Sequence, residues 1–265
     1  MKLFNNIFKI LTIGIVLFIS SCSVDEVIDP NNPPLDGVLN DASKTELQVL
    51  VTGLEARHRE YYGSATQMFG SFGREVWCYF GSDPRFISHW LGIGLTTTYT
   101  DFFASEGTYI NPYLAVKQAN VLEASANNAT ILTNAERKGY LGFAKTIKAY
   151  QLIWPLMQQY QNGIRIDVVD RLNPGPTVSY TEALTAIRDL LDEAYNELQS
   201  AEFSFILTSG FENFNTPLTF SKVNRAIAAR VALYDGAYDD ALTILGDSFL
   251  DINVDNNSTE KMWVG

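Results

Sequence analysis

The sequence has few cysteines, few histidines and too few basic residues to balance its acids. Two cysteines allow at most one disulfide bond, which excludes a small scaffold held together by several disulfides. Two histidines make a metal or catalytic centre built from histidine unexpected. The 19 Lys and Arg residues against 30 Asp and Glu residues leave a formal net charge of −11. Because nucleic acids and anionic lipids attract clustered cations, neither is an expected partner.

Sequence motifs of common enzyme classes are also absent. The chain has no Gly-x-Ser-x-Gly, no His-Glu-x-x-His, no phosphate loop and no Rossmann glycine pattern. Residues 251–255 begin like a calcium-binding EF-hand loop, but Asn256 and Met262 stand where glycine and glutamate are required. We therefore expect no metal site, and the missing motifs argue against an enzyme. A glycosidase pair of carboxylates remains open, because such a pair is defined by separation in space.

The first 21 residues are typical of a bacterial lipoprotein signal peptide. Lys2 and Lys9 precede an apolar run, 10–19, which is shorter than the roughly 20 residues that span a bilayer. Small residues then lead into Cys22 in a pattern that resembles the lipobox, which implies cleavage before Cys22 and lipidation of that residue. The alternative is a buried apolar helix that contains a cysteine. With Cys22 acylated, Cys78 has no disulfide partner and is interpreted as a small buried hydrophobe.

Residues 22–40 are predicted to form a lipidated tether. They are rich in proline, asparagine and aspartate, a composition that favours an extended linker. Asp25 and Glu26 resemble the acidic export signal of Bacteroidetes surface lipoproteins, although any solvated tether would have a similar composition. The expected organisation is therefore a signal peptide at 1–21, a tether at 22–40 and a globular domain at 41–265.

The globular part has the periodicity of helices. With 46% hydrophobic residues it can bury a sizeable core, and apolar residues at spacings of three and four predict amphipathic helices. Thr133 and Ser179, each followed three residues later by glutamate, form capping-box patterns at helix starts. Pro155 is expected to kink or end its helix. The expected helices cover residues 45–61, 102–126, 134–160 and 180–198, with another starting near Ser221.

The segment 226–242 predicts a helical hairpin. Small residues occupy one helix, Gly236 supplies a turn, and Tyr238-x-x-Ala241 opens the next helix. This pattern is typical of a tetratricopeptide hairpin, although the sequence has no tandem repeat with a period of 34 residues. The expected fold class is mainly α, with tetratricopeptide-like hairpins and long irregular loops at 63–100 and 201–219.

Aromatic and polar residues gather between Arg74 and Phe103, in a stretch rich in glycine. Sugars present C–H faces on which aromatic rings stack, and hydroxyls that polar side chains bind, so this composition favours a glycan site. The candidate ligand-binding residues are Trp90, Arg85, Asp83, Tyr99 and Trp77. Trp90 and Arg85 rank first because they flank no long apolar run, whereas Trp77 beside Cys78 has more core-like neighbours. The alternative is that these aromatics pack in the core.

Three other conspicuous side chains are assigned to structure. Trp154 and Tyr160 fall in a predicted helix and are expected in the core. His58 stands among charged residues and is expected on a solvated helix face.

Several stretches occur in a characteristic order. They are the lipobox at Cys22, the acidic tether, the helix around 50–54, and the segments 113–120, 136–150 and 224–234. Together they resemble the SusD/RagB family of Bacteroidetes outer-membrane lipoproteins, up to about residue 250. Asn120 stands where that family often has an Ala-Asn pair. The resemblance implies a SusD-like helical fold and a non-catalytic binding protein that is lipid-anchored in the outer membrane and exposed at the cell surface.

Further properties follow from the resemblance alone. Such proteins bind glycans, oligosaccharides or other nutrients and deliver them to a SusC-like TonB-dependent transporter. The resemblance implies no catalytic residue and no cofactor. Their ligand contacts include the loop region after the first helix, which corresponds here to 74–103. Because family members are about twice as long, the resemblance implies that the C-terminal part of the domain is absent from this chain.

Two other functions remain open from the sequence. The first is a non-catalytic helical-repeat adaptor of the cell envelope, which predicts a concave helical face and buried aromatics. The second is a lipid-anchored enzyme acting on glycans, which predicts two facing carboxylates with one raised pKa. A glycan-binding protein instead predicts exposed aromatic residues beside polar groups.

Overall fold

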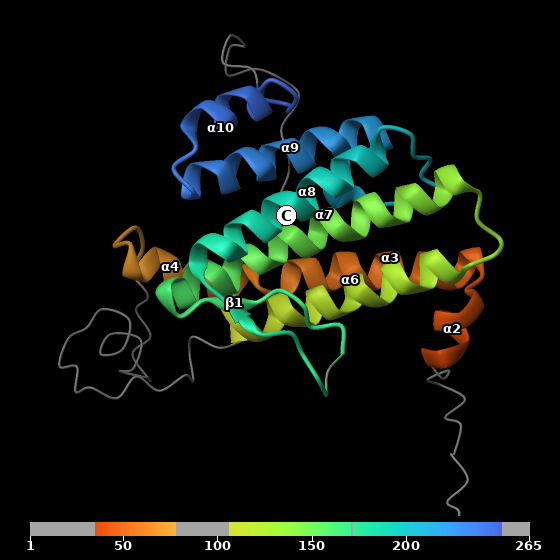
Figure 1. Cartoon of the computed structure of the whole chain (residues 1–265), viewed down its shortest axis with the longest axis horizontal. Coiled ribbons are helices and arrows are strands. Elements are labelled where there is room, and N and C mark those ends of the chain that lie inside the picture. The colour runs from red at the N-terminus through yellow and green to blue at the C-terminus, as the bar shows by residue number, and fades with distance from the viewer. Residues whose placement is uncertain (1–34, 78–105, 171, 251–265) are drawn as a thin grey trace, which may run out of the picture. The chain divides into compact units, whose positions relative to one another are not determined.

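The computed structural model describes residues 35–77, 106–170 and 172–250 (Figure 1). These residues are mainly helical, which confirms the expected mainly α fold class. The chain divides into two units, Met1–Leu35 and Asp36–Gly265, and the fold described below is that of the second.

Five long helices form the body of the fold. The elements in chain order are α2 (Leu35–Asp41), α3 (Lys44–Glu60), α4 (Tyr62–Phe72), a π-helical turn η2 (Glu106–Ile110), α6 (Asn111–Asn128), α7 (Asn134–Gln159), a 3₁₀ turn η3 (Tyr160–Asn162), β1 (Ile164–Arg165), β2 (Thr177–Val178), α8 (Tyr180–Leu198), a 3₁₀ turn η4 (Ser209–Phe211), α9 (Pro217–Tyr234) and α10 (Tyr238–Leu245). Consecutive long helices pack against each other, α3 on α6, α6 on α7, α7 on α8 and α8 on α9 (Figure 1). They alternate in direction, so α3, α7 and α9 all end at the same end of the stack.

Capping boxes start four of these helices. Thr133 caps α7 with Glu136, and Ser179 caps α8 with Glu182, as the sequence predicts. Ser43 caps α3 in the same way. Thr216 caps α9, which therefore begins at Pro217, four residues before the expected start. In each box the side chain of the cap accepts a backbone N–H that the helix itself leaves unpaired.

The central helix α7 is buried on two sides. One hydrophobic cluster joins it to α3 and α6 through residues such as Phe143, Leu54 and Leu122. A second cluster joins it to α8 and α9 through Leu152, Leu191 and Val231, among others. Glycines make the approach of α8 possible, because a Cβ atom on Gly142 would lie 2.6 Å from Leu198 Cγ.

Of the two alternatives for Pro155, the structure excludes the one in which the proline ends the helix, and α7 runs through it as the helix expected over 134–160 does. The helix continues to Gln159 with Pro155 inside it. A proline removes one backbone hydrogen bond, but Leu152, Ile153 and Leu156 around it are all buried. The packing of these side chains outweighs the lost bond.

A buried polar network joins α7, α8 and α9. Asn224 Nδ2 donates to Thr146 Oγ1 at 2.8 Å and to the Leu191 carbonyl at 3.0 Å. Its Oδ1 accepts from Nε and Nη2 of Arg225, at 2.9 and 2.6 Å. Arg225 also binds Asp192 at 2.7 Å. Asn224 and Arg225 lie in one of the stretches that resemble the SusD/RagB family, and here they tie three helices together.

Two N-terminal segments differ from the expectation. Residues 35–41 are helical although the tether was expected to be extended to 40, since Asn128 donates to the Leu39 carbonyl at 2.8 Å and Thr130 binds Asp41. Residues 62–72 form α4 inside the range expected to be irregular. The spacing of Ala65, Met68 and Ser71 buries one face of that helix despite its glycines.

The hairpin of α9 and α10 is present as predicted. Gly236, with φ of 74°, makes the turn between the two helices, and α10 packs against α9. A positive φ is easily adopted by glycine and costly for other residues. The expected helix over 102–126 corresponds to α6, which ends at Asn128 and is preceded by the turn η2.

The surroundings of two side chains differ from those that the sequence predicts. Tyr160 was expected in the core, but it lies in the turn after α7 and is 55% exposed. His58 was expected to be solvated, but its half-buried ring contacts Tyr61, Tyr150 and Phe211. Trp154 is half-buried beside Tyr61. The sequence pattern shows on which face of a helix a residue lies but not what packs against that face.

Candidate binding site

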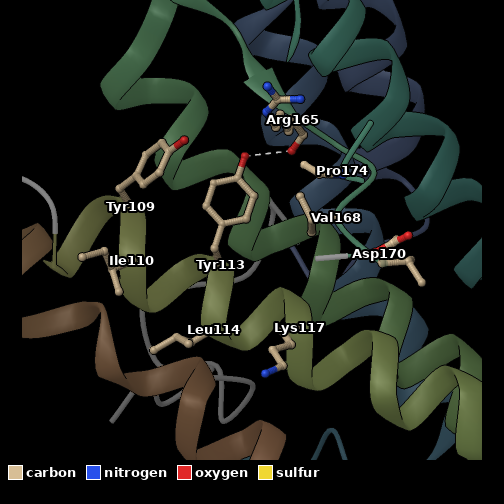
Figure 2. A pocket seen from close by; sticks show the side chains of 10 residues that line it. Tyr109, Ile110, Tyr113, Leu114, Lys117, Arg165, Val168, Asp170 and Pro174 are labelled. Carbon is tan, nitrogen blue, oxygen red and sulfur yellow. Dashed lines mark hydrogen bonds between the residues drawn. The ribbon is translucent and has the colours of Figure 1, made fainter. Parts of the chain in front are cut away.

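A pocket of about 420 Å³ lies between the start of α6 and the loop that joins β1 to β2 (Figure 2). Its lining residues come from three places in the chain: the turn η2, the helix α6, and β1 with the loop after it. They are Tyr109, Ile110, Tyr113, Leu114, Lys117, Arg165, Val168, Val169, Asp170 and Pro174.

The turn η2 positions the aromatic side of the pocket. A Cβ atom on Gly107 would overlap Ser64 of α4, so glycine allows the turn to pack closely against that helix. Thr108 Oγ1 donates to Gln158 Oε1 at 2.5 Å, which joins the turn to α7. Pro112 then occupies the first turn of α6, where its missing N–H costs little. π-Helical turns of this kind are frequent at functional sites.

Two tyrosines form the aromatic wall. The ring centroids of Tyr109 and Tyr113 are 5.0 Å apart with an angle of 58° between the planes. The Tyr113 hydroxyl donates to the Arg165 carbonyl at 2.7 Å, the dashed line in Figure 2. Burial raises the pKa of Tyr113, so the hydroxyl keeps its proton at neutral pH and remains a donor. Both rings are half-buried, and each leaves part of its surface accessible.

The opposite wall is the loop after β1, which is held by its own polar groups. Asp170 accepts backbone N–H bonds from Leu172 at 2.8 Å and Asn173 at 3.2 Å. The hydrogen bond from the Asn173 side chain lowers the pKa of the Asp170 carboxyl most, and the backbone bonds from Leu172 and Asn173 lower it further. The Arg165 guanidinium donates to the Gly175 carbonyl. Beside Arg165 and Asp170, this wall of the pocket consists of the apolar residues Val168, Val169 and Pro174.

Lys117 supplies a positive charge at the pocket. It lies one turn after Tyr113 on α6 and is exposed. Within 35–77, 106–170 and 172–250 it has no hydrogen-bond or ion-pair partner. The pocket therefore offers two aromatic rings, an apolar wall and one free ammonium group. This combination can stack a sugar ring or hold an apolar side chain, and it can donate hydrogen bonds to hydroxyl or carboxylate oxygens.

The described residues that line the pocket do not include a pair of carboxylates. Asp170 is the one carboxylate among its lining residues, and the loop already engages it. Two facing carboxylates are needed for the usual mechanism.

The structure describes one of the predicted ligand residues. Trp77 is 61% exposed, so the suggestion that it packs in the core beside Cys78 is wrong. The chain turns after α4 at Arg74, with φ of 64°, and Val76 packs against Gly70 while Trp77 faces solvent. Other predicted positions lie outside the described residues, and these are Trp90, Arg85, Asp83, Tyr99, Cys78 and the lipidation site Cys22.

The sequence analysis missed the pocket residues. Tyr109, Tyr113 and Lys117 follow one another at four-residue spacing, a helical signal that could have placed them on one face. Nothing in the sequence indicates that the loop after Arg165 lies opposite this face, because 48 residues separate Lys117 from Arg165 in the numbering.

Two further properties concern metals and membranes. In the described part of the chain, no three His, Cys, Asp or Glu side chains are grouped so that they could hold a metal ion. None of the helices described here is long and apolar enough to cross a membrane.

The chain was compared with protein-family models, curated proteins and solved structures. No family model, curated protein or solved structure matches it, so these comparisons assign no function.

Proposed function

We propose that the protein is a cell-surface lipoprotein of the SusD/RagB type, which binds glycans or other nutrients without catalysis. In this proposal it is anchored in the outer membrane through Cys22 and delivers its ligand to a SusC-like TonB-dependent transporter. The pocket of Tyr109, Tyr113 and Lys117 carries the proposal. Half-buried aromatic rings beside a free donor are the arrangement that a sugar ring with hydroxyls requires.

The order of elements also supports this assignment. The capped helix α7, the polar network at Asn224 and Arg225, and the hairpin of α9 and α10 coincide with stretches that resemble the family. The exposed Trp77 supports ligand binding as well, because a pure adaptor predicts buried aromatics. The SusD-like fold, the lipid anchor and the transporter partner remain parts of the proposal.

Tyr109→Ala is expected to weaken polysaccharide binding about tenfold, since it removes one stacking ring from the pocket. The measurement is affinity electrophoresis of the protein from Ser23 onward in gels containing starch, xylan or galactan. Tyr238→Ala serves as the control, because Tyr238 is a 66% exposed tyrosine on α10 outside the pocket. Equal retardation of wild type and Tyr109→Ala in a gel that retards both would remove the pocket from the proposal.

The same gels distinguish the alternative of an envelope adaptor. The observation that favours an adaptor is the apolar surface of the α9–α10 hairpin, where Leu233, Tyr238 and Leu242 are exposed. A well-folded protein that none of the polysaccharides retards would favour this adaptor or a peptide ligand.

Cys22→Ala is expected to release the protein from the outer membrane, because the proposed anchor is a lipid attached to that thiol. The measurement is the fraction of protein recovered with outer membranes from cells that express the full chain. Cys78→Ala is the matched control and should fractionate like wild type. A Cys22→Ala variant that still fractionates with the outer membrane would contradict the lipoprotein assignment.

A further inference from the structure

A second cluster of aromatic side chains surrounds Arg230, in the last two turns of α9. The guanidinium carbon lies 5.6 Å from the ring centre of Trp154 and 5.5 Å from that of Tyr234. Trp154 in turn stacks on Tyr61, with ring centroids 4.5 Å apart, and contacts Tyr150 edge-on at 5.8 Å. We call the surface formed by Arg230, Tyr234, Trp154, Tyr150 and Tyr62 the Arg230 face, which rests on the buried ring of Tyr61. It shares no residue with the pocket of Tyr109 and Tyr113.

The fold brings this set together from three helices. Because the long helices alternate in direction, the C-terminal ends of α3, α7 and α9 meet at one end of the stack (Figure 1). Tyr61 follows α3, and Tyr62 is the first residue of α4. Tyr150 and Trp154 lie in the second half of α7, and Arg230 lies near the end of α9. The Tyr61 and Tyr150 hydroxyls are 2.6 Å apart and hold the two rings in register.

Arg230 is a positive charge without a carboxylate partner in the described part of the chain. Its Nε donates to the Tyr234 hydroxyl at 2.6 Å, and no other hydrogen bond or ion pair engages it there. Acidic residues outnumber basic residues by 30 to 19, so the chain has many carboxylates that could have paired with Arg230. Asp235 follows at the end of α9 but pairs with Arg188 of α8, at 3.5 Å.

The Tyr234 hydroxyl orients the guanidinium and leaves its two terminal nitrogens free. Arg230 is exposed, so these nitrogens are accessible to a ligand. A guanidinium offers its N–H groups as a planar fork, which matches the two oxygens of a carboxylate. An oriented, accessible fork without an internal partner is suited to an external anion.

Ring surface is available beside the fork. Tyr62 is 50% exposed, and Tyr150, Trp154 and Tyr234 are half-buried, so their rings are supported from below and partly open. The Trp154 Nε1 atom is buried and has no hydrogen-bond partner in the described part of the chain. The face thus combines a cation without a carboxylate partner and several ring surfaces.

We infer that the Arg230 face is a second binding site, which takes a sugar that bears a carboxylate, such as a uronic acid. The carboxylate accepts two N–H bonds from the Arg230 fork, and the C–H face of the sugar ring packs on the neighbouring aromatic rings. A neutral sugar would leave the guanidinium unpaired. The site stands on its own residues and does not depend on the pocket at α6.

The test is isothermal titration of trigalacturonic acid and its fully methyl-esterified form into the protein from Ser23 onward. The acid is expected to bind at least about tenfold more tightly than the ester, because esterification removes the charge that Arg230 recognises. Arg230→Gln is expected to weaken binding of the acid at least about tenfold. Lys138→Gln is the matched control, since it removes the same charge near the start of α7, where Lys138 binds Ser200.

A second variant keeps the test independent of any folding defect. Tyr234→Phe retains the ring and the charge and removes only the hydroxyl that orients the guanidinium. It is expected to weaken binding of the acid about threefold without changing the thermal midpoint. The inference is overturned if the acid does not bind, if acid and ester bind equally, or if Arg230→Gln binds like wild type. An equal loss in Lys138→Gln would also overturn it, because the attraction would then be nonspecific.

Discussion

Replacing Asn224 with leucine is expected to lower the free energy of unfolding by about 3 kcal/mol. Asn224 is fully buried, and its amide bridges Thr146 of α7, the Leu191 carbonyl of α8 and the guanidinium of Arg225. Leucine has a similar volume, so the packing remains while the hydrogen bonds are lost. The most costly bonds to remove are those to the charged guanidinium of Arg225. Arg225 is only 6% exposed, and in the variant its Nε and Nη2 lose their acceptor, Asn224 Oδ1.

The measurement is urea denaturation of wild type and variant, compared at a common slope. Asn196→Leu is the control, because it replaces the same residue type on the solvent face of α8, where Asn196 is exposed. A double-mutant cycle with Thr146→Val isolates the bond between the two side chains. A loss below about 1 kcal/mol for Asn224→Leu would show that the three helices are held by apolar packing alone.

Acidification from pH 6.5 to pH 4 is expected to cost about 3 kcal/mol of stability through His58 alone. Burial, aided by the nearby charge of Arg59, lowers the pKa of His58 from its usual 6.5 to about 4. The Gln151 amide donates to Nδ1 of His58 at 2.8 Å, so the folded state binds the neutral ring. Since the folded pKa lies below the unfolded value, this contribution is complete above pH 6.5 and is lost progressively as the pH falls through 4.

Two measurements check this expectation. In an NMR titration the ring resonances of His58 should shift with a midpoint near 4, and a midpoint above about 5.5 would contradict the burial that the structure shows. Urea denaturation of wild type and His58→Phe at pH 7 and pH 4.5 provides the second. Between these two conditions wild type should lose about 2.5 kcal/mol more than the variant. The titration of carboxylates affects both proteins and therefore cancels.

Both proposed ligand sites depend on the same end of the helix stack. The pocket lies at the start of α6, and Arg230 lies near the end of α9, at the end where α3 and α7 also finish (Figure 1). Asn224 and Thr146 hold α9 against α7 about two turns from Arg230 and Trp154. The polar network therefore supports the ligand-binding end, although it contacts neither proposed ligand.

Local signals in the sequence were sufficient for most of the helices. Thr133 with Glu136 and Ser179 with Glu182 start α7 and α8 where predicted, because a capping box is a contact between residues three apart. Gly236 ends α9 for an equally local reason, its positive φ. Such features depend on neighbours in the chain and can be read from the chain.

Predictions failed where distant packing overrides local preference. The glycines at 63 and 70 do not prevent α4, and His58 is covered by residues from α7 and the turn η4. In each case the deciding contact comes from a segment that the local pattern does not reveal.

The sequence by itself determined the mainly α class, the helix starts at capping boxes and the helical hairpin around Gly236. It also carries the expectation of a lipid anchor at Cys22. Only the tertiary structure decided where the two proposed sites lie. Tyr113 meets the loop after Arg165, and Trp154 meets Arg230, because alternating helices return distant segments to one end of the stack. Periodicity fixes the face of each helix, whereas the partner of that face is chosen by the packing of the whole chain.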